Sequence, residues 1–207
     1  MNLKEAKEIT GGLSAPSKMP GYAYNLPAWK CVTGVKLQAI KGSVCSGCYA
    51  MKGRYRFPNV KDALNRRLNS LTHPQWVEAI SFLISHYSKK VPFFRWHDSG
   101  DLQGAWHLKK IFEVCNQTPA VSHWMPTREA KLLTLMDPAV VPKNLIIRMS
   151  SHMIDQKPVS FWSWTSTVST GLTQPGHRCP AQQQGNECKS CRQCWDKKIS
   201  NIAYPLH

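Results

Sequence analysis

The stretch "VPFFRWHDSGD" (residues 91–101) changes abruptly from apolar to polar. Its first half is typical of a short buried strand, and its second half of a loop that turns tightly at Gly100. The next segment, 105–117, repeats apolar residues at helical spacing, and 120–127 again has the composition of a strand. A strand, a helix and a strand at this spacing predict a right-handed crossover between parallel strands.

The same alternation extends in both directions. Segments 59–71 and 72–88 predict two amphipathic helices, and Thr127 is expected to cap a helix over 128–137. Further strands are predicted at 144–152, 160–168 and 201–207. We expect a single α/β domain over 1–207, mostly irregular over 1–40 and cysteine-rich over 177–207. An eight-fold barrel usually needs more residues, so the predicted fold is a small or incomplete TIM-barrel-like (β/α) barrel of parallel strands, or an open α/β sheet.

Composition indicates the compartment in which the protein works and the class of partner that it binds. The first ten residues carry charge throughout and lack the apolar region of a secretory signal, and no stretch is apolar enough to span a membrane. We therefore expect a cytoplasmic protein with reduced thiols. The formal net charge is +15, which favours encounter with polyanions such as nucleic acid, acidic glycan or anionic cell wall.

Polar residues follow three consecutive predicted strands. "HDSGD" ends the first, and "HWMPT" and "SSH" end the next two. Functional residues of such folds gather at the carboxyl ends of the strands. We therefore expect His97, Asp98 and Asp101 to form a catalytic set or to bind a divalent ion for hydrolysis, joined by His123 or His152. The alternative is structural: Asp98 and Ser99 would cap the following helix, and Asp101 would complete the turn.

The cysteines form a second candidate site. Cys115 lies on an apolar helical stripe and is expected in the core. The other seven form two groups, an early one and a late one: Cys31, Cys45 and Cys48, and then Cys179, Cys188, Cys191 and Cys194. The late spacing C-x8-C-x2-C-x2-C indicates metal binding.

The third closely spaced cysteine favours a [4Fe–4S] cluster over zinc, which remains the alternative. The ligands could come from both ends of the chain, in one metal site that joins the terminal regions, or from the last four cysteines alone.

Three ordered motifs resemble a known family. They are "CSGCYAMKGRY" (45–55), "RWHDSGDLQ" (95–103) and "RCP…ECKSCRQCW" (178–195), followed by "IAYPLH" (202–207). The chain resembles the phage "gene product 88" family of cysteine-rich proteins and is more distantly similar to the radical SAM superfamily. The resemblance implies a phage-encoded iron–sulfur protein in the cytoplasm of a bacterial host.

The chain departs from the radical SAM pattern. That superfamily carries C-x3-C-x2-C and leaves one iron open to S-adenosylmethionine, whereas here the third cysteine would have to be Cys31, fourteen positions before Cys45. Two functions therefore stay open. One is an iron–sulfur enzyme acting on a small-molecule or cell-wall substrate, by radical-SAM-like chemistry or by hydrolysis with a structural cluster. The other is a non-enzymatic, metal-stabilised module that binds a host polyanion.

Overall fold

A computed structural model describes residues 1–171 and 174–206, which form an α/β fold around one parallel sheet. The strand order is β1-β2-β3-β4-β5-β7-β6, and every pair is parallel. The strands are β1 (Tyr22–Tyr24), β2 (Phe93–Trp96), β3 (Ser122–Thr127), β4 (Leu145–Ser150), β5 (Thr165–Ser169), β6 (His177–Arg178) and β7 (Asn201–Pro205). The parallel α/β class is thus confirmed. The strands keep chain order until the last pair, as in a (β/α) barrel, but β1 and β6 are edges, so the described sheet is open.

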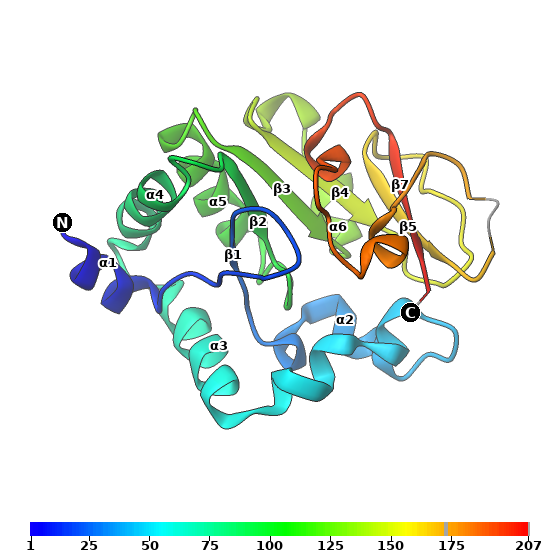
Figure 1. The fold of residues 1–207 in the computed structure, drawn as a ribbon, viewed down its shortest axis with the longest axis horizontal. Helices are drawn as coiled ribbons and strands as arrows, with labels where there is room; N and C mark the ends of the chain where they lie inside the picture. The colour runs from blue at the N-terminus through cyan, green and yellow to red at the C-terminus, as the bar shows by residue number, and fades with distance from the viewer. Residues whose placement is uncertain (172–173, 207) are drawn as a thin grey trace.

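Helices accompany only the first half of the sheet (Figure 1). They are α3 (Pro58–Ser70) and α4 (Trp76–Tyr87) before β2, α5 (Ala105–Gln117) before β3, and α6 (Ala130–Thr134) before β4. The helices predicted over 59–71, 72–88 and 105–117 are confirmed, because their apolar stripes pack on the sheet. Between β4 and β7 the described chain has loops and short 3-10 turns in place of helices. No helix in the described part of the chain has the length and apolarity needed to cross a membrane.

Regular structure in the first forty residues exceeds the expectation. Helix α1 (Leu3–Thr10) begins with a capping box, in which Asn2 accepts from the Glu5 amide and Glu5 accepts from the Asn2 amide. Helix α2 (Val32–Gln38) follows Cys31. The largely irregular segment predicted over 1–40 therefore contains two helices and strand β1.

Two local predictions are also corrected. Helix α6 begins at Ala130, after Glu129, and Thr127 is the last residue of β3 instead of a helix cap. The strand predicted over 160–168 begins only at Thr165, because Trp162 lies in the preceding loop and donates from its indole to the Ile147 carbonyl.

The main core fills the space between the helices and β1–β4. Trp76, Trp96, Ile80 and Ile111 are fully buried in it. Cys115 is also fully buried there, so its predicted core position is confirmed. This core gives the helix-backed half of the sheet a stability of its own.

The C-terminal half of the fold is attached to the sheet by a buried charge, Arg148 of β4. Its guanidinium is fully buried and donates five hydrogen bonds to backbone carbonyls. One acceptor is Thr165 of the neighbouring strand, at 3.4 Å. The others, each at 3.0 Å, belong to a single late loop: Gln193, Cys194, Asp196 and Ile199. Arg148 therefore ties the loop that carries Cys194 to the centre of the sheet.

We predict that Arg148→Lys lowers the free energy of unfolding by roughly 2–4 kcal/mol, because an ammonium offers three donors where the guanidinium supplies five, and buried carbonyls lose their partners. Urea unfolding of the variant and of the control Arg66→Lys, at an exposed position, measures the difference. An equal stability of the two variants would contradict the anchoring role.

Candidate active site

A cavity of about 330 Å³ lies where the strands end. One wall comes from the carboxyl ends of β2 to β5, and the other from α2 and the turns that follow it, to which the strand arrows point in Figure 1. Residues from the three predicted strand ends meet here: the lining includes the polar His97, Asp98, Ser150 and Ser151 from the first and third, but only Trp124 and Pro126 from the second.

His97 follows β2 directly and is almost fully buried in the cavity wall. Its backbone φ is 59°, a left-handed conformation that is uncommon outside glycine. Neither ring nitrogen has a hydrogen-bond partner among the described residues. Burial holds the His97 pKa well below its usual value, so the ring is neutral and keeps one donor and one acceptor available.

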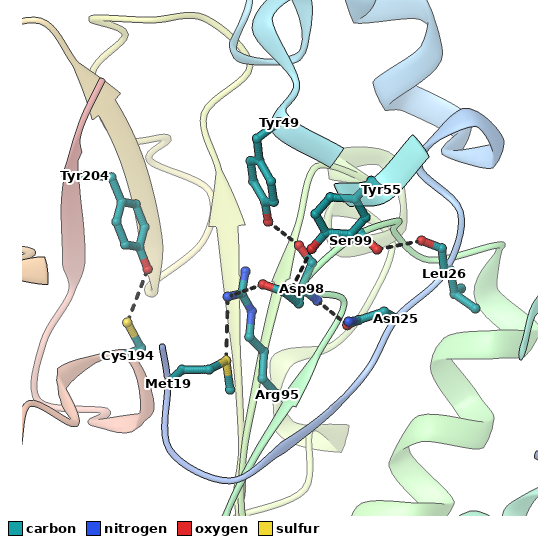
Figure 2. Close-up of polar contacts among 10 residues, drawn as sticks. All are labelled: Met19, Asn25, Leu26, Tyr49, Tyr55, Arg95, Asp98, Ser99, Cys194 and Tyr204. Atoms are coloured by element: carbon teal, nitrogen blue, oxygen red, sulfur yellow. Dashed lines mark hydrogen bonds and ion pairs between the residues drawn. The ribbon is translucent and has the colours of Figure 1, made fainter. Parts of the chain in front are cut away.

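Asp98 lies at the centre of a polar network (Figure 2). Its carboxylate forms an ion pair with Arg95 at 2.9 Å and accepts from the Tyr55 hydroxyl at 2.8 Å. Its carbonyl accepts from the Tyr49 hydroxyl. Helix α5 begins seven positions later, at Ala105, so Asp98 does not cap it. The alternative capping role is therefore wrong for Asp98.

The neighbouring residues hold the loop in place. Ser99 does not cap α5 either, because its hydroxyl donates to the Leu26 carbonyl at 3.0 Å. Asp101 is buried and accepts from the Thr127 hydroxyl at 2.6 Å and from the Leu102 and Arg128 amides at 2.8 Å each. Burial raises the Asp101 pKa to about 6. Asp101 thus fastens the loop after β2 to the end of β3.

The two further histidines do not join the set. His123 lies at the start of β3, in the core, with Nε2 2.9 Å from the Thr118 hydroxyl. The expectation that it reaches the strand ends is wrong, because it precedes most of the strand. His152 follows β4, but its Nε2 donates to the Arg128 carbonyl at 2.9 Å and the residue does not line the cavity.

The early cysteines, Cys31, Cys45 and Cys48, all line the same cavity. A Cβ atom placed on Gly34 would lie 3.5 Å from the Cys31 Sγ and 3.7 Å from the Cys45 Sγ, so these two thiols flank one point beside α2. Burial raises the pKa of both thiols. The glycine thus leaves the space in which the two sulfurs approach each other.

Glu129 holds this segment against the sheet. Its carboxylate accepts from the Thr33 amide at 2.8 Å and from the Thr33 hydroxyl at 2.7 Å. Thr33 lies two residues after Cys31, in the first turn of α2. A residue at the end of β3 therefore fixes where the first thiol of the early group enters the cavity.

The late cysteines form a separate group beside β7. The Cys194 Sγ lies 3.2 Å from the Tyr204 hydroxyl (Figure 2), and the Cys191 Sγ lies 3.8 Å from the His177 Nε2. Burial raises the Cys194 pKa to about 12, whereas the charges of Arg148 and Arg95 act to lower it. Tyr204 also lines the cavity, so this group lies behind one wall of it.

All eight cysteines are free thiols. The early cysteines line the cavity and the late ones lie beside β7, and which of them would ligate a metal stays a prediction. Over residues 1–171 and 174–206, however, no three His, Cys, Asp or Glu side chains are close enough to hold a single metal ion. Iron, sulfide and zinc binding therefore stay predictions.

Sequence reasoning missed four residues of the cavity wall: Tyr49, Arg95, Arg128 and Tyr204. Arg95 carried a usable signal, because it is a cation between the buried Phe94 and Trp96 of an alternating strand. Its guanidinium stacks 4.4 Å from the Trp124 ring. The other three stand in segments whose course depends on tertiary contacts, so no local pattern marks them.

A family model described as Gene product 88 matches residues 1–197 of this chain. The match includes both cysteine groups and the loop after β2. No curated protein and no solved structure matches the chain.

The buried imidazole of His123 generates a pH prediction. Burial lowers its pKa to about 3, whereas in the unfolded chain the ring binds a proton near pH 6.5. The contribution of the neutral His123 ring to the free energy of unfolding is therefore fully present above about pH 6.5. It falls as the pH drops toward 3, by up to about 1.4 kcal/mol per pH unit. Urea unfolding of wild type and His123→Asn between pH 7 and pH 5 should give the variant the shallower slope, and equal slopes would contradict the assignment.

Proposed function

Because this chain belongs to the gene product 88 family and gathers three thiols in one cavity with His97 and Asp98, we propose that it is an iron–sulfur enzyme. Its substrate would be a small molecule held at the ends of the parallel strands. The observation that carries the proposal is the shared cavity: Cys31, Cys45 and Cys48 line it together with the predicted catalytic loop. A purely structural metal would not need to face that loop. We place the protein in the cytoplasm of a bacterial host, where its thiols would stay reduced.

The donor set fits a cluster better than a zinc ion. Zinc needs four ligands about 2.3 Å from one centre, and the described thiols do not converge so closely. An iron–sulfur cluster binds its thiolates at different irons, so its ligands stand further apart. The two cysteine groups would hold one cluster each.

The two proposed clusters differ in their ligand count. The early group supplies three thiolates, which would leave one iron of a [4Fe–4S] cluster open toward the cavity. When bound there, such a cluster would supply an iron that can bind or reduce a small molecule. S-adenosylmethionine is one candidate but not the first, because the cysteine spacing departs from the radical SAM pattern. The late group supplies four thiolates, enough to close a structural cluster.

The buried cation Arg148 supports a cluster at the late cysteines. The fully buried Arg148 has no carboxylate partner among the described residues, and its charge acts on the Cys194 thiol. A buried charge without a counter-charge is costly. The negative charge of a thiolate-bound cluster would offset it.

Residues of the loop after β2 would handle the proton. His97 is neutral and unpartnered, so it is the residue that can accept a proton from a substrate in the cavity. The Asp98–Arg95 pair would orient the substrate beside it. Asp101 is engaged by three donors and would position the loop. The same set could serve hydrolysis if the early cluster were only structural.

A second candidate function is supported by the surface next to the cavity. Tyr49 and Phe57 are exposed large aromatics. The same segment, residues 49–61, also carries four exposed cations: Lys52, Arg54, Arg56 and Lys61. Exposed rings among cations are typical of surfaces that bind single-stranded nucleic acid. The alternative is therefore a module that binds a polyanion without catalysis.

We predict that anaerobically prepared protein carries about eight irons per chain, four for each cubane cluster. Cys45→Ser should remove about half of the iron and leave the late site, and Cys191→Ser should remove the other half. The core variant Cys115→Ser is the control and should retain all of it. Iron, sulfide and zinc analysis with electron paramagnetic resonance measures this, and one stoichiometric zinc without iron would overturn it.

We predict that Asp98→Asn keeps the fold and the iron content but lowers activity by roughly 10²–10⁴-fold, because the amide cannot pair with Arg95. The assays would be release of 5′-deoxyadenosine from S-adenosylmethionine under reduction, and hydrolysis of ester, amide and phosphodiester substrates. Asp62→Asn, at an exposed position, is the control.

Unchanged activity in Asp98→Asn would remove this residue from the catalytic set. No activity in any assay, together with salt-sensitive binding of single-stranded nucleic acid, would favour the polyanion-binding module.

A further inference from the structure

The charges around the cavity do not balance. Asp98 is paired with Arg95 at 2.9 Å, and Asp101 accepts three hydrogen bonds from its own surroundings. Arg128 also lines the cavity, and its guanidinium has no ion pair within the described chain. Arg128 is therefore a cation of the cavity wall that lacks a carboxylate partner among the described residues.

The side chain of Arg128 is free for a ligand although its backbone is engaged. The amide donates to Asp101, and the carbonyl accepts from the His152 ring. The Nε atom, in contrast, is buried and has no hydrogen-bond partner among the described residues. The backbone contacts fix the position of Arg128, whereas its guanidinium has neither a hydrogen bond through Nε nor an ion pair within the described chain.

Four further residues of the wall also have buried polar atoms without partners among the described residues. They are Arg95 (Nε), Trp124 (Nε1), Ser151 at the end of β4 and His97 at the end of β2. Leaving a polar group buried and unpaired costs about 1–3 kcal/mol. Of these residues, Arg128, Ser151 and His97 follow three adjacent strands around one cavity, which indicates a ligand that satisfies them together.

We propose that the cavity binds its small molecule through a carboxylate or phosphate group, with Arg128 as the charged partner and Ser151 and His97 as additional hydrogen-bond donors. A guanidinium with a hydroxyl and an imidazole is a donor set that matches anionic oxygens. The cavity volume of about 330 Å³ is at the small end of the range for small-molecule sites. This inference rests on the proposed function in one respect, the reaction that the bound molecule undergoes. Binding of the anion itself does not depend on it.

The test measures binding of isolated anions to the full-length, anaerobically purified protein. Inorganic phosphate and acetate would be titrated by calorimetry at constant ionic strength, and the two arms decide between phosphate and carboxylate. Arg128→Gln should weaken the preferred anion roughly 10- to 100-fold, the range for a hydrogen bond to a charged group. Ser151→Ala should weaken it a few-fold.

Arg66→Gln removes the same charge from an exposed position and is the matched control. It should bind the anion like wild type, since general attraction by a +15 surface does not depend on one exposed arginine. Melting temperatures of all variants are recorded, and Arg128→Gln should match wild type because its side chain makes no hydrogen bond through Nε.

The inference is overturned if neither anion binds, or if Arg128→Gln binds the anion as tightly as Arg66→Gln. It is also overturned if Arg128→Gln shifts the reduction potential of the iron and leaves anion affinity unchanged, because Arg128 would then balance the nearby thiolates. Iron analysis of the same samples separates the two proposals. Anion binding without iron removes the proposed function alone, and iron without anion binding removes this inference alone.

Discussion

The hydrogen bonds of Arg148 determine how the C-terminal part of this molecule is built. A guanidinium sealed inside the fold needs all its donors satisfied, and here five backbone carbonyls satisfy them. Four of these carbonyls belong to residues 193–199, a loop with little regular structure of its own. The position of Cys194 therefore follows from the position of β4, although the two are distant in the chain.

Glu129 does for the early cysteines what Arg148 does for the late ones. It binds Thr33 through two hydrogen bonds and so fixes α2 and Cys31 at the end of β3. Both anchors come from the middle strands of the sheet, and each holds a segment from one end of the chain. The early cysteine segment thus lines the cavity, and the late one lies behind Tyr204 in the cavity wall.

The sequence predicts the helices and strands of the framework, but it does not predict the contacts through which Arg148 and Glu129 anchor the cysteine segments. Helices α3 and α5 and strands β2 to β4 show periodic apolar residues, because their side chains are sorted by burial against one core. Arg148 and Glu129 act through partners far away in the chain, so no local pattern reports them. His123 was misplaced for a related reason: periodicity gives the strand, but whether a residue starts or ends it decides which edge of the sheet it reaches.

The uneven distribution of the core also bears on synthesis. Helices and the main core back β1–β4, all of which lie before residue 151, and the late cysteine loop packs onto this sheet through the Arg148 hydrogen bonds and the buried Trp195. A chain leaving the ribosome can therefore bury its main core, and place the early thiols at the strand ends, before the late cysteines have been made. Any metal inserted at the late group would meet a platform that is already folded.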